Sequence, residues 1–125
     1  MGIENIFDNT PANLFRLQHR GGMKYQLIAP IFHEDGDMMS IFLEEDGDLI
    51  RISDNGVSLM RLSYTFDVNT DNKKKQLNSI IMAQNAENNG GEITLTVPKG
   101  EIYSGIMRYA QIVGQVCNLD ALKGV

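Results

Sequence analysis

The chain has few of the residues that stabilise a small protein outside the cell or anchor it in a membrane. It contains one cysteine, Cys117, and no tryptophan. A single cysteine excludes an internal disulfide, and its apolar neighbours predict a buried thiol in a reducing compartment. No apolar run approaches the roughly 18 residues that span a bilayer, and the first residues lack the basic start and apolar stretch of a signal peptide. We therefore expect a cytoplasmic protein with no membrane segment.

Basic charge is also scarce. The 11 Lys and Arg residues are outnumbered by 16 Asp and Glu residues, which gives a formal net charge of −5. Nucleic-acid-binding domains normally carry a basic surplus, so this balance argues against direct contact with nucleic acid. Phosphate-binding loops and nucleophile elbows are missing as well. We expect a protein that is not an enzyme and that holds no metal or other cofactor.

The pattern of apolar residues predicts one α+β domain over residues 1–125. A chain of this length can bury a core without disulfides. Thr10-Pro11 is a typical helix start and Gly21-Gly22 a typical helix end, which predicts an N-terminal helix between them. Pro30 predicts an edge position or a bulge in the strand that follows. The expected elements, in chain order, are the N-terminal helix, an antiparallel three-stranded meander (23–33, 38–44, 49–53), helices from about 57 and about 70, a strand at 92–98 and a long C-terminal helix at 101–122, all packed on one sheet.

Both turns of the expected meander read Glu-Asp-Gly-Asp, at residues 34–37 and 45–48. Asp-Gly between alternating runs predicts type I′ turns, which have positive φ at both central residues. Successive turns of a meander lie at opposite ends of the middle strand, roughly 20 Å apart at about 3.3 Å per residue, which is too far to share one ion. We interpret them as solvated turns that discourage edge aggregation. A metal-dependent hydrolase or nuclease that uses Asp37, Asp48 and Asp54 is the alternative.

The expected C-terminal helix carries two stripes of residues. One is apolar, and the other consists of four small residues, Ala110, Gly114, Cys117 and Ala121. Glycine inside a helix costs roughly 1 kcal/mol relative to alanine, so Gly105 and Gly114 indicate places where another element packs closely. We interpret the small stripe as close packing within the domain. The alternative is a self-association face that forms a homodimer.

Three motifs carry a family resemblance: Ala-Pro-Ile-Phe at 29–32, Asp-x-x-Ser-Ile-Phe-Leu at 37–43 and the run from Gly47 to Leu59. Through them, the stretch from residue 25 to residue 119 resembles an uncharacterised domain-of-unknown-function family of small bacterial and prophage proteins. The resemblance implies an α+β domain in a phage or mobile-element setting, and it brings no catalytic residues. It highlights one short segment, Asp54-Asn55-Gly56. A helix cap and a positive φ account for that segment structurally, and a contact site is the alternative.

The function that we expect is that of a non-enzymatic phage or prophage accessory protein that binds a host or phage protein. Inhibition of a host defence system, nucleic-acid-guided or restriction-based, is its most concrete version. The expected contact residues are Asp54, Asn55, Gly56, Glu45, Asp46 and Asp48. Besides the metal-dependent enzyme, a small-molecule or nucleotide sensor remains an alternative.

Overall fold

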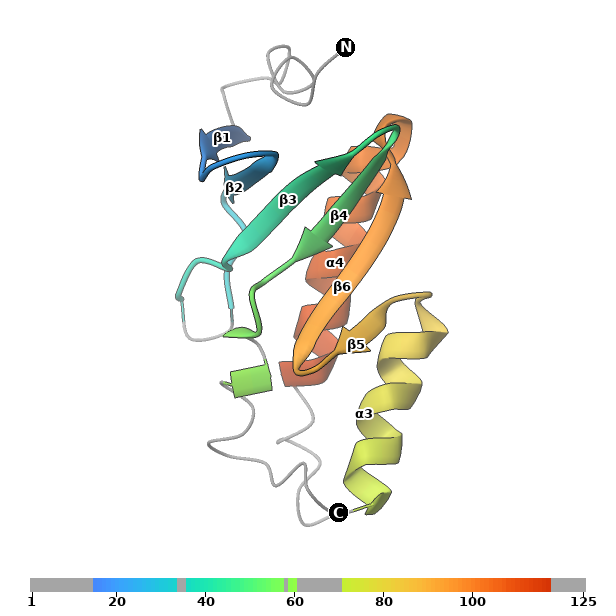
Figure 1. Ribbon diagram of the computed structural model, residues 1–125. Helices are drawn as coiled ribbons and strands as arrows, with labels where there is room; N and C mark the ends of the chain where they lie inside the picture. Colours follow the sequence, from blue (N-terminus) through green and yellow to red (C-terminus); the bar gives the residue numbers. More distant parts are fainter. Residues whose placement is uncertain (1–14, 34–35, 58, 61–70, 118–125) are drawn as a thin grey trace.

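The computed structural model describes residues 15–33, 36–57, 59–60 and 71–117. These residues form an α+β structure with a six-stranded antiparallel sheet in the order β1-β2-β3-β4-β6-β5, as Figure 1 shows. The α+β class predicted from the sequence is therefore confirmed. The elements are β1 (Arg16–His19), β2 (Lys24–Ile28), β3 (Ile41–Asp46), β4 (Leu49–Ser53), α3 (Asp71–Ala83), β5 (Glu87–Asn89), β6 (Glu92–Pro98), the 3₁₀ turn η2 (Lys99–Glu101) and α4 (Ile102–Cys117).

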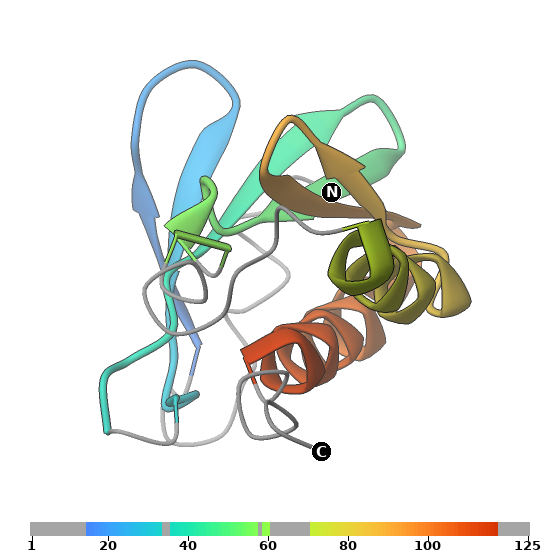
Figure 2. The same cartoon turned by 90° about the horizontal axis from the view of Figure 1, so that it is seen from below.

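The two helices lie on the same face of the sheet (Figure 2). Helix α4 runs behind β4 and β6, and α3 lies beside it near β5. The predicted strand at 92–98 is confirmed as β6, because the side chains of Ile93, Leu95 and Val97 are buried against α4. The apolar stripe of α4 is buried on the same side, through Ile102, Ile106, Tyr109, Ile112, Val113 and Val116. In the described part of the chain, no helix is long and apolar enough to cross a membrane.

The predicted N-terminal helix is wrong in its described part. Residues Arg16–His19 form strand β1, which pairs antiparallel with β2. Gly21 and Gly22 have φ values of 105° and 55° and sit in the hairpin turn between the two strands. Positive φ suits a helix end and a hairpin turn equally well, so the glycine pair was consistent with both. Thr10 and Pro11 lie outside the described residues.

The meander also differs in its details from the prediction. The first predicted strand ends at Ile28, and the chain is bulged at Pro30, as the proline indicated. The pairing of β2 with β3 is regular as far as Leu27↔Ile41 and resumes at the bridge Phe32↔Met38, beside which the Met39 N–H donates to the Ile31 carbonyl oxygen. Three residues, Ile28 to Pro30, therefore lie opposite Ser40 alone. With β1 added, four consecutive strands pair in chain order, not three.

The turn between β3 and β4 is of another type than predicted. Asp46 pairs with Leu49, so Gly47 and Asp48 are the two central residues. Only Gly47 has positive φ, at 61°, which is the φ pattern of a type II′ turn. The tip of the first Glu-Asp-Gly-Asp segment, residues 34–35, lies outside the described residues.

Three further elements complete the described structure. Strand β5 was not predicted from the sequence; it pairs with β6 through a turn at Gly90 and Gly91. The helix expected from about residue 57 begins as predicted, since Val57, Leu59 and Met60 are helical. The helix expected from about residue 70 is confirmed as α3.

Candidate functional site

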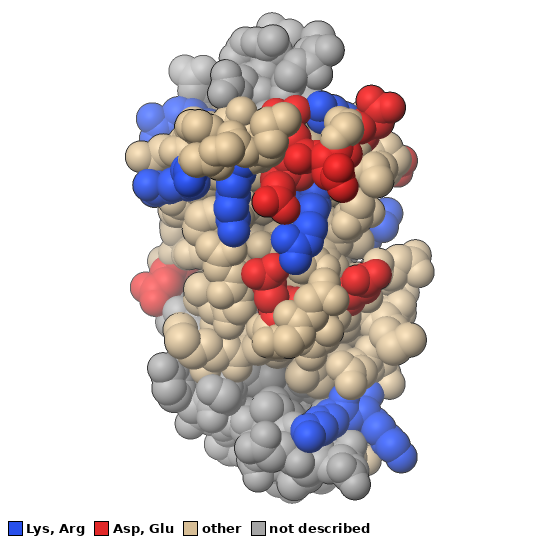
Figure 3. Space-filling view, viewed as in Figure 1, with Lys and Arg blue, Asp and Glu red and all other residues tan. Residues whose placement is uncertain are grey.

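One face of the sheet is covered by α3 and α4, and no described element covers the other. Because side chains alternate along a strand, the residues that alternate with the buried ones lie on this uncovered face. They are predominantly polar, and Figure 3, which looks onto this face, shows where the charges gather. Lys and Arg side chains lie over β1 and β2, and Asp and Glu side chains lie towards the β3–β4 turn. The central strands contribute Phe42, Glu44, Arg51, Ser53, Glu92, Thr94 and Thr96.

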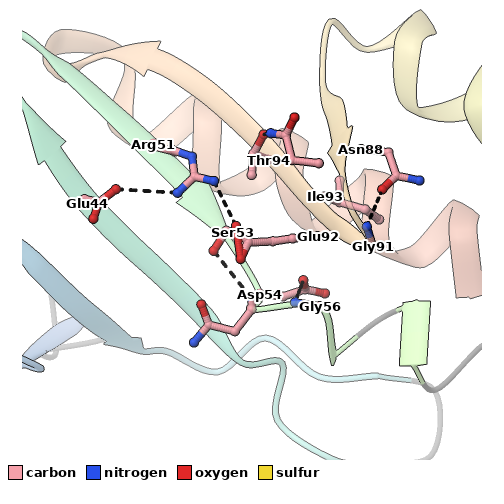
Figure 4. A network of polar contacts seen from close by, with 12 residues as sticks. Glu44, Arg51, Ser53, Asp54, Gly56, Asn88, Gly91, Glu92, Ile93 and Thr94 are labelled. Carbon is pink, nitrogen blue, oxygen red and sulfur yellow. Dashed lines mark hydrogen bonds and ion pairs between the residues drawn. The ribbon is translucent and has the colours of Figure 1, made fainter.

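Arg51 lies at the centre of the uncovered face, between two carboxylates (Figure 4). Its Nη1 lies 3.5 Å from Glu44 Oε1, and its Nη2 donates to Glu92 Oε1 at 2.9 Å. The guanidinium is thereby held across three neighbouring strands, β3, β4 and β6. All three side chains are partly exposed, so solvent screens the ion pairs and each contributes about 1 kcal/mol or less to stability. The network orders the surface more than it stabilises the fold.

The segment Asp54-Asn55-Gly56 forms a tight turn at the end of β4. Asn55 and Gly56 have φ values of 56° and 83°, the type I′ pattern, and the Val57 N–H donates to the Asp54 carbonyl oxygen at 3.2 Å. The turn is braced on the β5–β6 side, since a Cβ added at Gly56 would lie 3.3 Å from the Gly91 carbonyl oxygen. The structural role expected for this glycine therefore has a geometric basis: φ is positive and the neighbouring backbone is close.

Asn55 is the exposed member of this turn. Its Oδ1 accepts a hydrogen bond from Lys24 Nζ at 2.8 Å, which connects the turn to β2. The same ammonium lies 5.3 Å from the centroid of the Phe42 ring, within the range of a cation–π contact. Lys24, Phe42 and Asn55 thus form an ordered group beside the Arg51 network.

Asp54, in contrast, is buried, with 3% of its surface exposed. Its Oδ1 accepts the Gly56 N–H at 3.0 Å, which closes an Asx turn. Its carboxylate also faces Tyr109 of α4, whose hydroxyl donates to the Ile93 carbonyl oxygen at 2.7 Å. Burial, and after it the charge of Asp54 and a hydrogen bond with Asp54, raise the pKa of the Tyr109 phenol. Asp54 therefore shapes the loop from below and exposes almost none of its own surface.

The raised pKa of Tyr109 gives an alkaline stability prediction. Above pH 10 the unfolded state loses the phenol proton and the folded state keeps it. The unfolded state then binds fewer protons, so the free energy of unfolding falls as pH rises, by up to about 1.4 kcal/mol per pH unit from this group. Urea unfolding between pH 9 and pH 11 (roughly spanning the ordinary tyrosine pKa) should show a steeper decline for the wild type than for Tyr109→Phe. Tyr103→Phe is the comparison: burial also raises the pKa of that phenol, but its side chain is exposed, so its removal should change the slope less. Equal slopes for wild type and Tyr109→Phe would contradict the prediction.

The acidic residues of the β3–β4 hairpin lie at the other end of β4. Glu45 is largely buried and forms an ion pair with Lys99 Nζ at 2.8 Å. Asp46 and Asp48 are exposed at the turn. The six expected contact residues therefore form two groups separated by the length of β4, and the structure does not bring them into one surface.

The three aspartates of the metal-dependent alternative are not brought together either. Asp48 and Asp54 lie at opposite ends of β4, and Asp37 lies in the connection between β2 and β3. Within the described ranges, no group of three or more His, Cys, Asp or Glu side chains is arranged to hold a metal ion.

The small stripe of α4 is half-buried at Ala110, Gly114 and Cys117, and Ala121 lies outside the described residues. A Cβ added at Gly114 would meet no atom within 4 Å. Ala110 and Cys117 pack against the core, as the preferred interpretation of the stripe expects, whereas Gly114 has no close neighbour among the described residues. The self-association face remains a prediction.

This openness makes Gly114→Leu a clean test of self-association. Because no described atom lies within 4 Å of a Cβ at this position, we expect the leucine to convert a dimer into a monomer in analytical ultracentrifugation without loss of helix content. Gln111→Leu, at an exposed position of the same helix, is the matched control. A wild type that sediments as a monomer at high concentration would remove the basis of the prediction.

The uncovered face contains residues that sequence reasoning missed. Arg51, Glu92 and Lys24 were not expected to take part in a site. The pairing Glu44↔Arg51 follows from the β3–β4 turn, so hairpin geometry could have found it. The contacts of Arg51 with Glu92 and of Lys24 with Asn55 join strands that are distant in the sequence, and no local pattern indicates them.

Comparison with known families identifies one family. The profile of a family described as a domain of unknown function, DUF1828, matches residues 29–116. The chain belongs to this family, and the match spans the sheet from the end of β2 to β6 and nearly all of α4. No curated protein and no solved structure matches the chain.

Proposed function

We propose that the protein is a non-enzymatic binding domain that recognises another protein through the uncovered face of its sheet. The observation that carries this proposal is the ordered polar surface on that face. Arg51 is held between two carboxylates, and Lys24 is held between an amide oxygen and an aromatic ring. Surface side chains fixed in this way lose little conformational entropy when a partner binds.

The chemistry of this face also favours a protein partner. Arginine and aromatic side chains are enriched where proteins meet, and a rim of mixed charge sets orientation and association rate. Phe42 and Arg51 lie on the uncovered face of the central strands β3 and β4. Basic side chains lie on one flank of this face and acidic side chains on the other (Figure 3). In its most specific form, the proposal is a phage or prophage accessory protein that inhibits a host defence system.

Site-specific photo-cross-linking tests the proposal. A photoreactive amino acid placed at Thr96, exposed on β6 of the uncovered face, should capture one partner in stoichiometric amounts from cells of the source organism. The same group at Gln111, exposed on α4, is the matched control and should not. The captured protein, purified separately, should bind the wild type but bind Arg51→Glu more weakly. Equal capture from both positions, or no capture from Thr96, would overturn the proposed surface.

The defence-inhibitor form needs its own experiment. Expression of the protein should raise phage plating on a strain with an active defence system and leave plating unchanged on a strain from which that system is deleted. Arg51→Glu should lose the effect, and Lys75→Glu, the same charge reversal on exposed α3, should retain it. Unchanged plating in strains that carry restriction or nucleic-acid-guided systems would overturn this form and leave the binding domain itself in place.

A further inference from the structure

Strand β1 forms one edge of the sheet. It is the outermost strand in the sheet order, and among the described residues it pairs with β2 only. The Arg20 N–H donates to the Lys24 carbonyl oxygen at 2.9 Å. Because hydrogen-bonded pairs alternate in an antiparallel ladder, the N–H and C=O groups of Leu17 and His19 point away from β2. These groups are the template that an additional strand requires.

The β1–β2 hairpin is also a basic region in an acidic protein. From residue 9 to residue 33 the chain contains three Lys or Arg residues and no Asp or Glu, whereas the whole chain has a net charge of −5. By strand alternation, Arg16, Gln18 and Arg20 lie on the uncovered face, and Lys24 follows on β2. In Figure 3 these cations gather at the side of the molecule where β1 and β2 lie.

Arg20 is held in place within this region. Its Nε donates to Gln26 Oε1 at 2.9 Å and its Nη2 donates to Gln18 Oε1 at 3.1 Å and to Gln26 Oε1. A guanidinium has five N–H donors in a fixed planar fork. Among the described residues the donors on Nη1 have no partner, so they can meet a carboxylate. Fixing the fork in advance lowers the entropic cost of binding an anion.

We infer that β1 is a docking edge for an acidic, extended segment of a partner protein, which would add to the sheet as a further strand. Main-chain hydrogen bonds to Leu17 and His19 would supply the pairing, and carboxylates at alternate positions of the segment would meet Arg16 and Arg20 on the uncovered face. This inference rests on the proposed function, because it names the chemistry of the partner.

Charge decides between this occupant and two others. A second copy paired through β1 would place Arg16 and Arg20 beside the same arginines, and like charges on neighbouring strands are destabilising. A nucleic acid would satisfy the cations but would leave the outward N–H and C=O groups of Leu17 and His19 without strand pairing. An acidic polypeptide satisfies both the charges and the backbone groups.

The test begins with selection from a displayed library of random peptides of about nine residues, a length that covers a typical strand. Peptides selected on the full chain should be enriched in Asp and Glu at alternate positions. Their affinity should fall by about tenfold when salt rises from about 50 mM to about 500 mM, since exposed charges are screened over that range. Selected peptides without acidic enrichment, or no selected peptides, would overturn the inference.

Two substitutions at one position separate backbone pairing from side-chain contact. His19→Pro removes an outward N–H and no bond of the β1–β2 ladder, whereas His19→Ala removes the same side chain and keeps the N–H. We expect selected peptides to bind His19→Pro at least about tenfold more weakly than His19→Ala. Equal affinities would overturn strand addition.

A charge pair keeps the test decisive if His19→Pro fails to fold. Arg16→Glu should weaken the selected peptides by about tenfold, and Lys75→Glu on α3 should leave their affinity unchanged. Equal effects would overturn the role of the basic hairpin, and displacement of the peptides by a single-stranded oligonucleotide would favour a nucleic acid instead. If cross-linking from Thr96 captures a partner while these peptide experiments fail, the inference is wrong and the proposed function survives.

Discussion

Replacing Gly105 with Leu is expected to lower the free energy of unfolding by about 3 kcal/mol or more. A Cβ at this position would lie 2.8 Å from Val97 Cγ2 and 3.2 Å from Ile52 Cδ1, and both side chains are buried. Neither methyl group can swing into solvent, so α4 would have to move away from the sheet. Guanidinium denaturation followed by circular dichroism measures the loss.

Gly114→Leu is the matched control on the same helix. A Cβ there meets no atom within 4 Å, and leucine has a higher helix propensity than glycine. We therefore expect this variant to gain up to about 1 kcal/mol, measured at a concentration low enough to exclude association. Similar losses at Gly105 and Gly114 would show that helix geometry, and not contact with the sheet, sets the requirement for glycine.

These two glycines show where the sequence stops being informative about packing. Both interrupt an amphipathic helix in the same way, and the sequence predicts a close approach at each. Only the packing of α4 on β4 and β6 distinguishes them, because Gly105 faces Val97 and Gly114 faces no neighbour in the part of the chain that the structure describes. The buried face of α4 was predictable from its periodicity, whereas the distance between α4 and each strand was not.

The error at the N-terminus has a similar cause. The stretch before Gly21 contains residues that suit a helix, and its strand conformation depends on pairing with β2. Strand β5 is a stronger example, because Glu87, Asn88 and Asn89 are residues that strands disfavour. Its pairing with β6 and the turn at Gly90-Gly91 override that preference. Tertiary pairing thus outweighs local propensity at both edges of the sheet.

The candidate site was predictable to the extent that it is local. The sequence indicated a turn with positive φ at Asp54-Asn55-Gly56, and the structure has positive φ at Asn55 and Gly56. The burial of Asp54 was not predictable, since it depends on Tyr109, which comes from a helix more than 50 residues further along the chain. Hence Asp54, one of the six expected contact residues, lies almost wholly buried beneath the turn that presents Asn55.

Asp54→Ala is accordingly expected to lower the free energy of unfolding by about 2–3 kcal/mol, because it leaves the Gly56 N–H without its acceptor in a partly buried turn and removes the buried carboxylate beside Tyr109. Asp54→Asn keeps an oxygen in the place of Oδ1, which accepts that N–H at 3.0 Å, and should lose about 1 kcal/mol. Urea unfolding of both variants measures the difference. Equal and small losses would contradict the structural role of the carboxylate.

Combining each variant with Tyr109→Phe separates the two contacts of Asp54. The contact with Gly56 lies within the turn, so its loss should add to that of Tyr109→Phe, whereas the contact with the phenol should appear as a coupling energy of about 0.5 kcal/mol or more.

The same variants bear on binding. If Asp54 only shapes the turn that presents Asn55, then Asp54→Asn should bind a captured partner as the wild type does, and Asn55→Ala should bind it more weakly. The reverse order would return Asp54 to the contact surface and would mean that the turn opens when the partner binds.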